Sequence, residues 1–260
     1  MKKLTAFIGA ILSLIPLGQP LLIKTSFVIT SSALMLSLPK KVNAESAVFY
    51  YNRGNDKGKR GDYYGAIADY TKAIEINPQF EKPYNNRGTA KDELKDYYGA
   101  IADYTKAIEI NPQYYKAYNN RGTAKVALED HYGAIADYTK AIEINPEYAE
   151  AYYNRGIAKR KLEDYYGAIA DYTKAIEINP RDQYAYNNRG IAKRKLKDYY
   201  GAIADYTKAI EINPNYKSAF KNRGIAKELI GDLQGACSDW RQTVFLSPND
   251  AASKWVRDQC

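Results

Sequence analysis

The feature of this chain that most constrains its fold is an internal repeat of 34 residues. Aligning the chain with itself gives six copies, over residues 47–80, 81–114, 115–148, 149–182, 183–216 and 217–250. Repeats of this length are typical of stacked arrays, because each unit is too small to bury its own apolar surface. We therefore expect a row of similar small units, each in contact with its neighbours.

Within each copy, the apolar residues follow the period of two α-helices. In the second copy, steps of three and four residues connect Tyr84, Gly88, Lys91 and Leu94, which therefore share one helical face. Asp96 then ends this helix and can cap the next one through its carboxylate. Pro112 ends the second helix, since the residue before a proline is pushed out of the α region. Each copy therefore predicts an antiparallel pair, with helix A first and helix B second.

Fixed positions in each copy also carry a known motif. In the third copy, positions 4, 8, 20, 24, 27 and 32 are Tyr118, Gly122, Ala134, Tyr138, Ala141 and Pro146. This pattern resembles that of tetratricopeptide repeat (TPR) proteins, here of an exported bacterial type, over residues 47–250. The resemblance implies an all-α fold, a right-handed α-α superhelical solenoid of TPR-type helix hairpins. It also implies that helix A of each copy lines a concave groove that holds another polypeptide.

The N-terminal segment, residues 1–44, has the features of a secretory signal. A short basic start is followed by apolar runs and by the small-residue ending Val42-Asn43-Ala44. These features predict cleavage near Ala44 and an exported protein, periplasmic or secreted. The alternative is an uncleaved membrane anchor with the repeats outside the cytoplasm, because the first apolar stretch is about long enough to span a bilayer.

The last ten residues, 251–260, predict a short helix that caps the array, since a solenoid must cover its terminal apolar stripe. Cys237 lies near the start of the last helix B, and Cys260 lies near the end of the capping helix. Antiparallel helices would bring these two ends together. In an exported chain the pair predicts a disulfide bond, and the alternative is two free thiols.

Charge and composition argue against several functions. The formal net charge is +8, but residues 1–44 hold five lysines and no acid, which leaves 33 basic and 30 acidic residues in the remainder. We therefore expect no nucleic-acid binding. One histidine and two cysteines do not supply the ligands of a structural zinc site, so no metal or cofactor is expected. The chain also offers no constellation of nucleophile and base, so we do not expect an enzyme.

Two positions depart from the common TPR pattern in all six copies, because position 7 is Arg where the pattern has Leu and position 11 is Lys where it has an aromatic residue. All six copies also carry Asp at position 23. A buried cation without an anion is strongly destabilising, so we expect each Arg to pair with an Asp of its own or the adjacent copy. The alternative is that these arginines bind an acidic ligand. The structural pairs are predicted among Arg87, Arg121, Arg155, Asp103, Asp137 and Asp171.

Position 6 is Asn in every copy and faces the groove in the TPR family. An amide side chain can both donate to and accept from a peptide group, so a row of them could hold an extended backbone. The alternative is that each Asn lies on the helix surface or bonds to the neighbouring helix. The six residues are Asn52, Asn86, Asn120, Asn154, Asn188 and Asn222.

Variable groove positions in the second half of the array would set specificity. Arg160 and Arg194 form a basic edge near Tyr153 and Ile157, which would suit a ligand with an acidic group and an apolar anchor. The alternative is a solvated charged rim.

The sequence therefore predicts an exported scaffold that binds a protein or peptide partner in its concave groove. A structural protein that assembles with itself is a second interpretation, because near-identical copies are mutually compatible. Binding of cell-wall glycans by exposed tyrosines is a third. Contact with a membrane is expected only through an uncleaved N-terminal segment.

Overall fold

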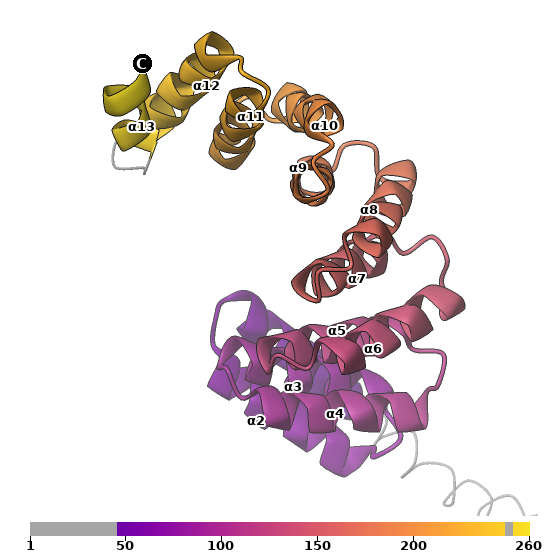
Figure 1. Ribbon diagram of the computed structural model, residues 1–260. Coiled ribbons are helices and arrows are strands. Elements are labelled where there is room, and N and C mark those ends of the chain that lie inside the picture. Colours follow the sequence, from indigo (N-terminus) through magenta and orange to yellow (C-terminus); the bar gives the residue numbers. More distant parts are fainter. Residues whose placement is uncertain (1–45, 248–251) are drawn as a thin grey trace, which may run out of the picture. The chain divides into compact units, whose positions relative to one another are not determined.

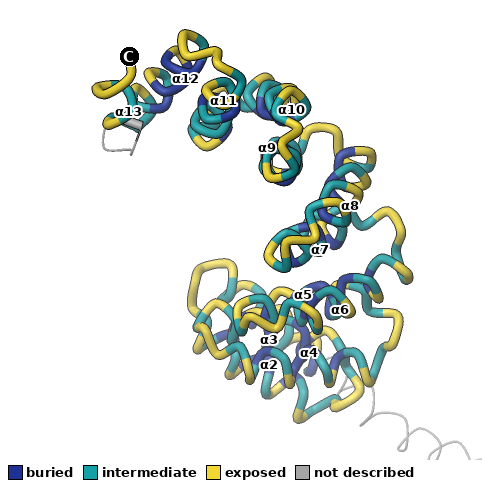
Figure 2. The backbone as a smooth tube through the Cα atoms, viewed as in Figure 1, coloured by how far each residue is buried: buried dark blue, intermediate teal, exposed yellow. Residues whose placement is uncertain are grey.

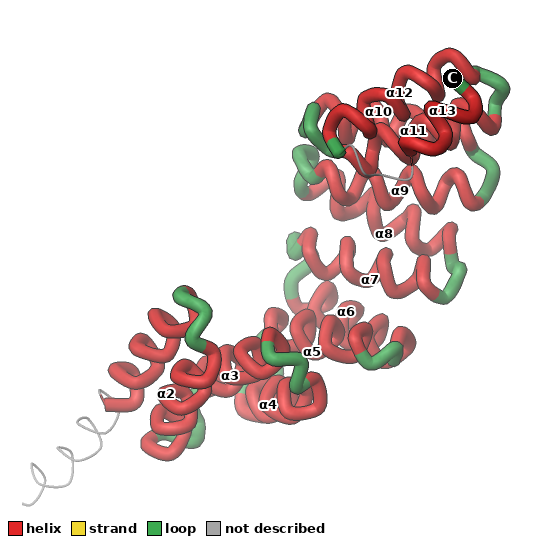
Figure 3. Tube along the Cα trace, turned by 90° about the vertical axis from the view of Figure 1, so that its left-hand side faces the viewer, coloured by secondary structure: helices red, strands yellow, loops and turns green. Residues whose placement is uncertain are grey.

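Every residue that the computed structural model describes, 46–247 and 252–260, lies in a helix or in a short connection between helices (Figures 1 and 3). The predicted all-α solenoid of TPR-type helix hairpins is confirmed. The predicted signal or anchor, residues 1–44, lies outside the described residues. Within the described part, no helix is both long enough and apolar enough to cross a membrane.

The helices alternate between the A and B types along the chain. Helix A of the first copy covers residues 46–59 of the described chain. The later A helices are α3 (Glu81–Glu93), α5 (Tyr115–Ala127), α7 (Ala149–Lys161), α9 (Gln183–Lys195) and α11 (Lys217–Leu229). The B helices are α2 (Tyr63–Ile76), α4 (Tyr97–Ile110), α6 (His131–Ile144), α8 (Tyr165–Ile178), α10 (Tyr199–Ile212) and α12 (Leu233–Leu246).

A short turn with a fixed chemistry joins helix A to helix B. In the second copy Lys95 takes a positive φ of 63°, which ends α3 in the left-handed region. The side chain of Asp96 then accepts a hydrogen bond of 3.0 Å from the backbone N–H of Gly99 and caps α4. The same aspartate cap begins every B helix of the described chain, at Asp62, Asp96, Asp130, Asp164, Asp198 and Asp232.

The core between the two helices of a pair is made of small residues and one tyrosine. Tyr104 of α4 is 2% exposed and packs against α3 at Gly88. A Cβ atom at Gly88 would lie 2.7 Å from the Tyr104 ring, so only glycine allows this close approach. Most loops between the helices are exposed (yellow in Figure 2). The buried apolar residues of the described repeats are therefore chiefly alanines and tyrosines.

Neighbouring copies are joined through both helix types. Each B helix packs chiefly against the A helix before it and the A helix after it. The successive A helices α3, α5, α7, α9 and α11 also contact one another directly. The A helices therefore lie side by side, and their exposed side chains form one surface, which we call the A-helix face.

The C-terminal helix α13 (Ala252–Gln259) packs on α12. Cys237 of α12 is bonded to Cys260, with their Cα atoms 5.6 Å apart. The ring of Trp255 lies 5.3 Å from that of Trp240, which is 1% exposed. The disulfide and this aromatic contact hold α13 against the last repeat.

Candidate functional site

The A-helix face is where the repeats differ from one another. Helices α2, α4, α8 and α10 share the single sequence YYGAIADYTKAIEI, and α6 differs from it only at His131. The A helices differ at most of their exposed positions, among them 9, 12 and 13. Over the first five copies, the A helices therefore present different side chains at different copies, whereas the B helices present nearly the same ones.

Three charged side chains support the surface in each copy. In the third copy, Arg121 donates from Nε and Nη2 to the two carboxylate oxygens of Asp137, at 3.0 and 2.7 Å. Lys125 lies 2.8 Å from the same carboxylate. Asp137 is 4% exposed, so the bidentate guanidinium and the ammonium together compensate a buried anion. All six copies hold this arrangement, which pairs each position-7 arginine with the aspartate of its own copy.

The same arginine also connects one copy to the copy before it. Arg121 donates from Nη1 to the Thr105 hydroxyl of the preceding helix B, at 3.0 Å. Its guanidinium lies 5.6 Å from the centre of the Tyr118 ring. The guanidinium of Arg121 is therefore already occupied by a carboxylate, a hydroxyl and an aromatic ring. This favours the structural role of these arginines over the binding of an acidic ligand.

In the first copy the ion pair has a clear electrostatic effect. Hydrogen bonds from Arg53, followed by the charge and hydrogen bond of Lys57, hold the pKa of Asp69 at about 2. Burial opposes this shift but is the smaller effect. Asp69 is therefore ionised over the whole physiological range.

The position-6 asparagines have partners that the sequence did not assign. Asn120 donates from Nδ2 to Oδ1 of Asn85 in the preceding A helix, at 3.1 Å. Asn188 donates in the same way to the Tyr153 hydroxyl, at 3.1 Å. Asn86, Asn154 and Asn222 make the equivalent bond to position 5 of the copy before them, whereas Asn52 belongs to the first copy and is exposed.

Five of the six asparagine amides are therefore already engaged as donors between helices. Of the two roles considered from the sequence, the structure shows the bond to the neighbouring helix. The reason is that positions 5 and 6 of adjacent A helices meet where the helices touch, a relationship that depends on the rotation between copies.

The residues expected to form a basic edge lie in a partly apolar setting. Tyr153 and Ile157 pack against the buried cluster around Tyr172. The Nε atoms of Arg160 and Arg194 are buried and have no hydrogen-bond partner in the described chain. The hydroxyls of Tyr172 and Tyr206 are also buried without a hydrogen bond of ordinary geometry, and each lies near one of these two guanidinium groups.

For the tyrosine hydroxyls, the difference from the earlier copies follows from the residue at position 9. In the second copy Tyr104 donates its hydroxyl proton to Thr89, at 3.3 Å. In the fourth copy the equivalent residue is Ile157, which offers no acceptor to Tyr172. The A-helix face is therefore polar in the first three copies and combines isoleucine, tyrosine hydroxyl and arginine in the fourth and fifth.

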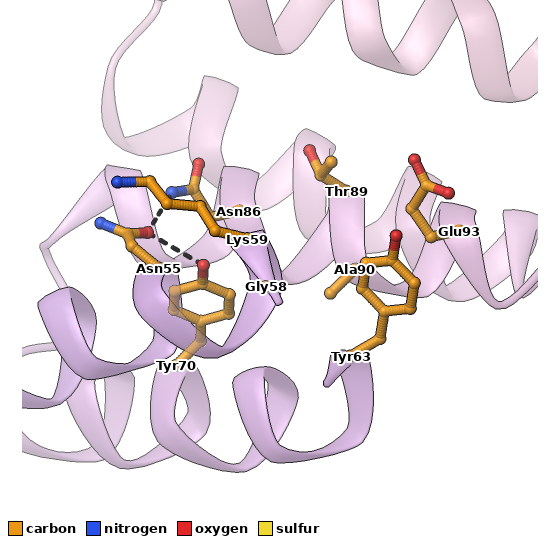
Figure 4. Close-up of a pocket in the computed structure, with 9 residues that line it drawn as sticks. All are labelled: Asn55, Gly58, Lys59, Tyr63, Tyr70, Asn86, Thr89, Ala90 and Glu93. Carbon is orange, nitrogen blue, oxygen red and sulfur yellow. Dashed lines mark hydrogen bonds between the residues drawn. The ribbon is translucent and has the colours of Figure 1, made fainter. Parts of the chain in front are cut away.

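A pocket of about 470 Å³ lies on this face between the first two A helices (Figure 4). Asn55 lies at one end of the pocket and accepts from the Tyr70 hydroxyl at 2.9 Å and from Asn86 at 2.8 Å. Lys59 lies at the Asn55 end, and Glu93 lies at the opposite end near Thr89 and Tyr63. The pocket therefore carries a cation at one end and an anion at the other.

The pocket was not predicted, although the sequence holds its cause. Position 12 is Gly58 in the first copy and a larger residue in the other five: Asp92, Val126, Arg160, Arg194 and Glu228. Packing does not require a glycine here, because a Cβ atom at Gly58 would meet only the Tyr70 hydroxyl at 3.7 Å and Ala66 at 4.0 Å. The missing side chain leaves the space between the two helices open.

In the described chain there is no group of three or more His, Cys, Asp or Glu side chains placed to hold a metal ion.

The repeated geometry defines a class of protein. It is an array of helical hairpins whose variable residues lie on one set of helices. The tetratricopeptide repeat family model matches residues 47–80, 82–114, 149–182 and 184–216, and a second TPR repeat model matches residues 124–162. The chain belongs to the tetratricopeptide repeat family.

Several solved structures share this fold. The TPR protein YrrB, which has an unusual peptide-binding site, is 24% identical over 72% of this chain and 97% of its own, with a TM-score of 0.62. MamA is 27% identical over 66% of this chain and 93% of its own, with a TM-score of 0.59. PilF of Pseudomonas aeruginosa is 17% identical over 84% of this chain and 99% of its own, with a TM-score of 0.73.

Proposed function

We propose that this protein is an exported scaffold that holds a peptide segment or a helix of a partner protein against its A-helix face. The observation that carries the proposal is the contrast between the nearly invariant B helices of the first five copies and the variable A helices within one chain. Uniform B helices are sufficient to build the array, so the variation among the A helices is available for recognition. The peptide-binding site of YrrB, a TPR protein with the same fold, supports this use of a TPR array.

The experiment is a selection of peptides from a random display library by the full chain, followed by binding measurements with two variants. Thr123→Arg with Ile157→Arg places two bulky cations on the A-helix face. Tyr132→Arg with Tyr166→Arg places the same charges on helix B of the same two copies, where both tyrosines are 76% exposed. We expect selected peptides to lose affinity for the first variant and to keep it for the second. Equal affinity for both variants would contradict the proposal.

Export is supported by the bond between Cys237 and Cys260, because disulfides persist mainly in oxidising compartments. N-terminal sequencing of the mature protein from the cells that make it is the direct test. We expect the first residue to be Glu45, after cleavage at Ala44. A mature protein that retains Met1 would instead indicate the membrane-anchored alternative.

Self-association is the second candidate function. Val48 and Phe49 are 45% and 57% exposed on the first A helix, which offers an apolar surface at one end of the array. Sedimentation velocity over a wide range of protein concentration separates the two functions. A scaffold for another protein sediments as a monomer throughout, and an assembly of this chain dissociates on dilution.

A further inference from the structure

The last turn of every A helix contributes two residues, positions 12 and 13, to one edge of the A-helix face. Because the A helices run in the same direction and contact their neighbours, these pairs form a row. We call it the C-terminal row. From the first copy to the sixth it consists of Gly58 and Lys59, Asp92 and Glu93, Val126 and Ala127, Arg160 and Lys161, Arg194 and Lys195, and Glu228 and Leu229.

From the second copy to the fifth, the charges of this row are segregated. Two acids occupy the second copy, two apolar residues the third, and four cations the fourth and fifth, while Lys59 in the first copy and Glu228 in the sixth carry the opposite charge to their neighbours. On the B helices, by contrast, opposite charges alternate as local pairs such as Lys106 and Glu109, 2.9 Å apart. Segregation on one edge and local pairing elsewhere are two different charge patterns in the same chain.

The effect of charge on helix stability explains the cations of this row but not its acids. The C-terminal end of a helix carries partial negative charge, so cations there stabilise it by about 0.3–1 kcal/mol and anions destabilise it by a similar amount. Lys161 and Lys195 therefore suit the ends of α7 and α9. Asp92 and Glu93 stand at the same place in α3, where they oppose the helix dipole.

The acidic pair also lacks compensation within the described residues. Neither Asp92 nor Glu93 has an ion-pair partner there, and Oδ1 of Asp92 is buried without a hydrogen bond. Burial, with a smaller contribution from the charge of Glu93, raises the pKa of Asp92. The two neighbouring acids have no counterion in the described chain, and a cation from outside, brought to the exposed carboxylate of Glu93, would supply one.

We infer that the C-terminal row selects a partner segment with the complementary order of charge: a basic side chain at Asp92 and Glu93, and acidic side chains at the cations of the fourth and fifth copies. The inference rests on the proposed function, because it specifies the partner of the same face. Val126 and Ala127 between the two charged regions leave room for apolar residues in the middle of the segment.

The spacing of the copies sets the length of this segment. Helices in contact lie about 8–10 Å apart, so the second and fourth copies are separated by about 16–20 Å. An extended chain advances about 3.3 Å per residue, so the basic and acidic residues of the partner would stand about five or six positions apart.

The pocket beside Gly58 gives the basic side chain a place to enter. The ring of Tyr63 offers apolar surface to the stem of a lysine or arginine, and Glu93 lies at the same end of the pocket (Figure 4). Lys59 lies at the other end. The Glu93 end of the pocket is therefore the part that suits a cation.

The test uses the full chain and two synthetic peptides of equal composition. One peptide is segregated, with two arginines separated by five apolar or neutral residues from two glutamates. The other is mixed, with the same residues in alternating order. Binding is measured by fluorescence anisotropy. We expect the segregated peptide to bind about tenfold more tightly than the mixed one, and the difference to decrease at high salt.

Two variants then test whether the preference for the segregated peptide depends on the acidic pair of the second copy. Asp92→Asn with Glu93→Gln keeps the side-chain shapes and should abolish the preference for the segregated peptide. Glu75→Gln with Glu109→Gln removes the same charge from exposed positions of helix B and should leave the preference unchanged. Circular dichroism of both variants checks that the helices are retained.

Three results would overturn the inference: equal binding of the two peptides, no measurable binding of the segregated peptide, or equal loss of preference in both variants. Equal binding of the two peptides that is lost in the Thr123→Arg with Ile157→Arg variant would reject the charge order and leave the proposed function in place. Binding that no A-helix variant changes would reject both.

Discussion

The guanidinium of Arg121 donates a hydrogen bond of 3.0 Å to the hydroxyl of Thr105, a residue of the preceding repeat. The same side chain holds the buried carboxylate of its own repeat through two further bonds. One residue therefore fixes both the internal geometry of a hairpin and its position against the previous hairpin. Five arginines of the chain make this pair of connections, at positions 87, 121, 155, 189 and 223.

The first prediction concerns the anion of this cluster. Asp137→Ala leaves Arg121 and Lys125 close together on a partly buried face with no anion, so we expect a loss of about 3 kcal/mol or more in the free energy of unfolding. Arg121→Met should cost less, because Lys125 remains 2.8 Å from Asp137. Replacing all three residues by apolar ones should cost least. Urea unfolding followed by circular dichroism gives the order, and three equal losses would contradict it.

The second prediction compares two glycines. Gly122→Ala places a Cβ atom 2.7 Å from the Tyr138 ring, which should destabilise the protein by about 1–3 kcal/mol. Gly58→Ala meets only ordinary contacts and should stabilise by about 0.5–1 kcal/mol through helix propensity. Melting temperatures of the two variants should therefore move in opposite directions. A shift of the same sign in both would show that the contact at Gly122 is looser than the structure indicates.

The third prediction concerns the asparagine connections between A helices. Asn120→Ala removes the donor to Asn85, which is 6% exposed, and should cost about 1–2 kcal/mol. Asn52→Ala is the matched control at the same repeat position, because Asn52 is exposed in the first copy. Its effect on the urea midpoint should be close to zero. Equal effects would mean that the bond between helices contributes nothing to stability.

The fourth prediction uses the pH dependence of Asp69. Its pKa lies at about 2 in the folded protein, chiefly because of hydrogen bonds from Arg53, and near 3.9 in an unfolded chain. The folded-state pKa is the lower one, so the ionised carboxylate stabilises the fold above about pH 4. This contribution decreases as the pH falls from about 4 to 2.

Hydrogen exchange measured on the peptide that contains α2 is the readout. Between pH 4 and 2, protection of α2 should fall more in the wild type than in Asp69→Asn, whose amide does not titrate in this range. A parallel decrease in the two proteins would show that Asp69 is not the group responsible.

The fifth prediction concerns the C-terminal cap. The bond between Cys237 and Cys260 closes a loop of 23 residues, for which about 3 kcal/mol of stabilisation is expected. The only two tryptophans of the chain, Trp240 and Trp255, lie in contact inside this cap. Tryptophan fluorescence therefore reports on the cap separately from the tyrosine-rich repeats.

Cys260→Ser should lower the temperature at which tryptophan emission changes, with little effect on the circular dichroism of the repeats. A reducing agent should reproduce this shift in the wild type and leave the variant unaffected. If the variant and the wild type melted at the same temperature by tryptophan emission, the disulfide would have no role in holding α13.

Much of the fold could be predicted from local patterns. The 34-residue period, the aspartate before each helix B and the proline after it are chemical signals carried by single residues. The sequence also identified the position-7 arginines and the position-23 aspartates as partners, since a buried charge demands a counterion. The sequence did not show whether each arginine pairs with the aspartate of its own copy or of the adjacent copy, because this depends on the angle at which the helices cross.

Contacts between copies were harder to predict. The sequence shows a threonine at position 25 in five copies, and nothing in it marks Thr105 as the partner of Arg121. The bond from Asn120 to Asn85 likewise depends on the rotation between neighbouring hairpins. The pocket beside Gly58 could have been found, because one glycine among five larger residues at position 12 is visible in the aligned copies.

The joints between hairpins recur with the same chemistry, which makes the length of the array adjustable in whole steps. Removing residues 115–148 would bring Asn154 and Arg155 next to the second copy, which offers them Asn85 and Thr105 in place of the equivalent Asn119 and Thr139. Such a shortened chain would also bring its acidic and basic regions one helix spacing closer. Gain or loss of single repeats is thus a simple way in which related proteins could bind shorter or longer partner segments.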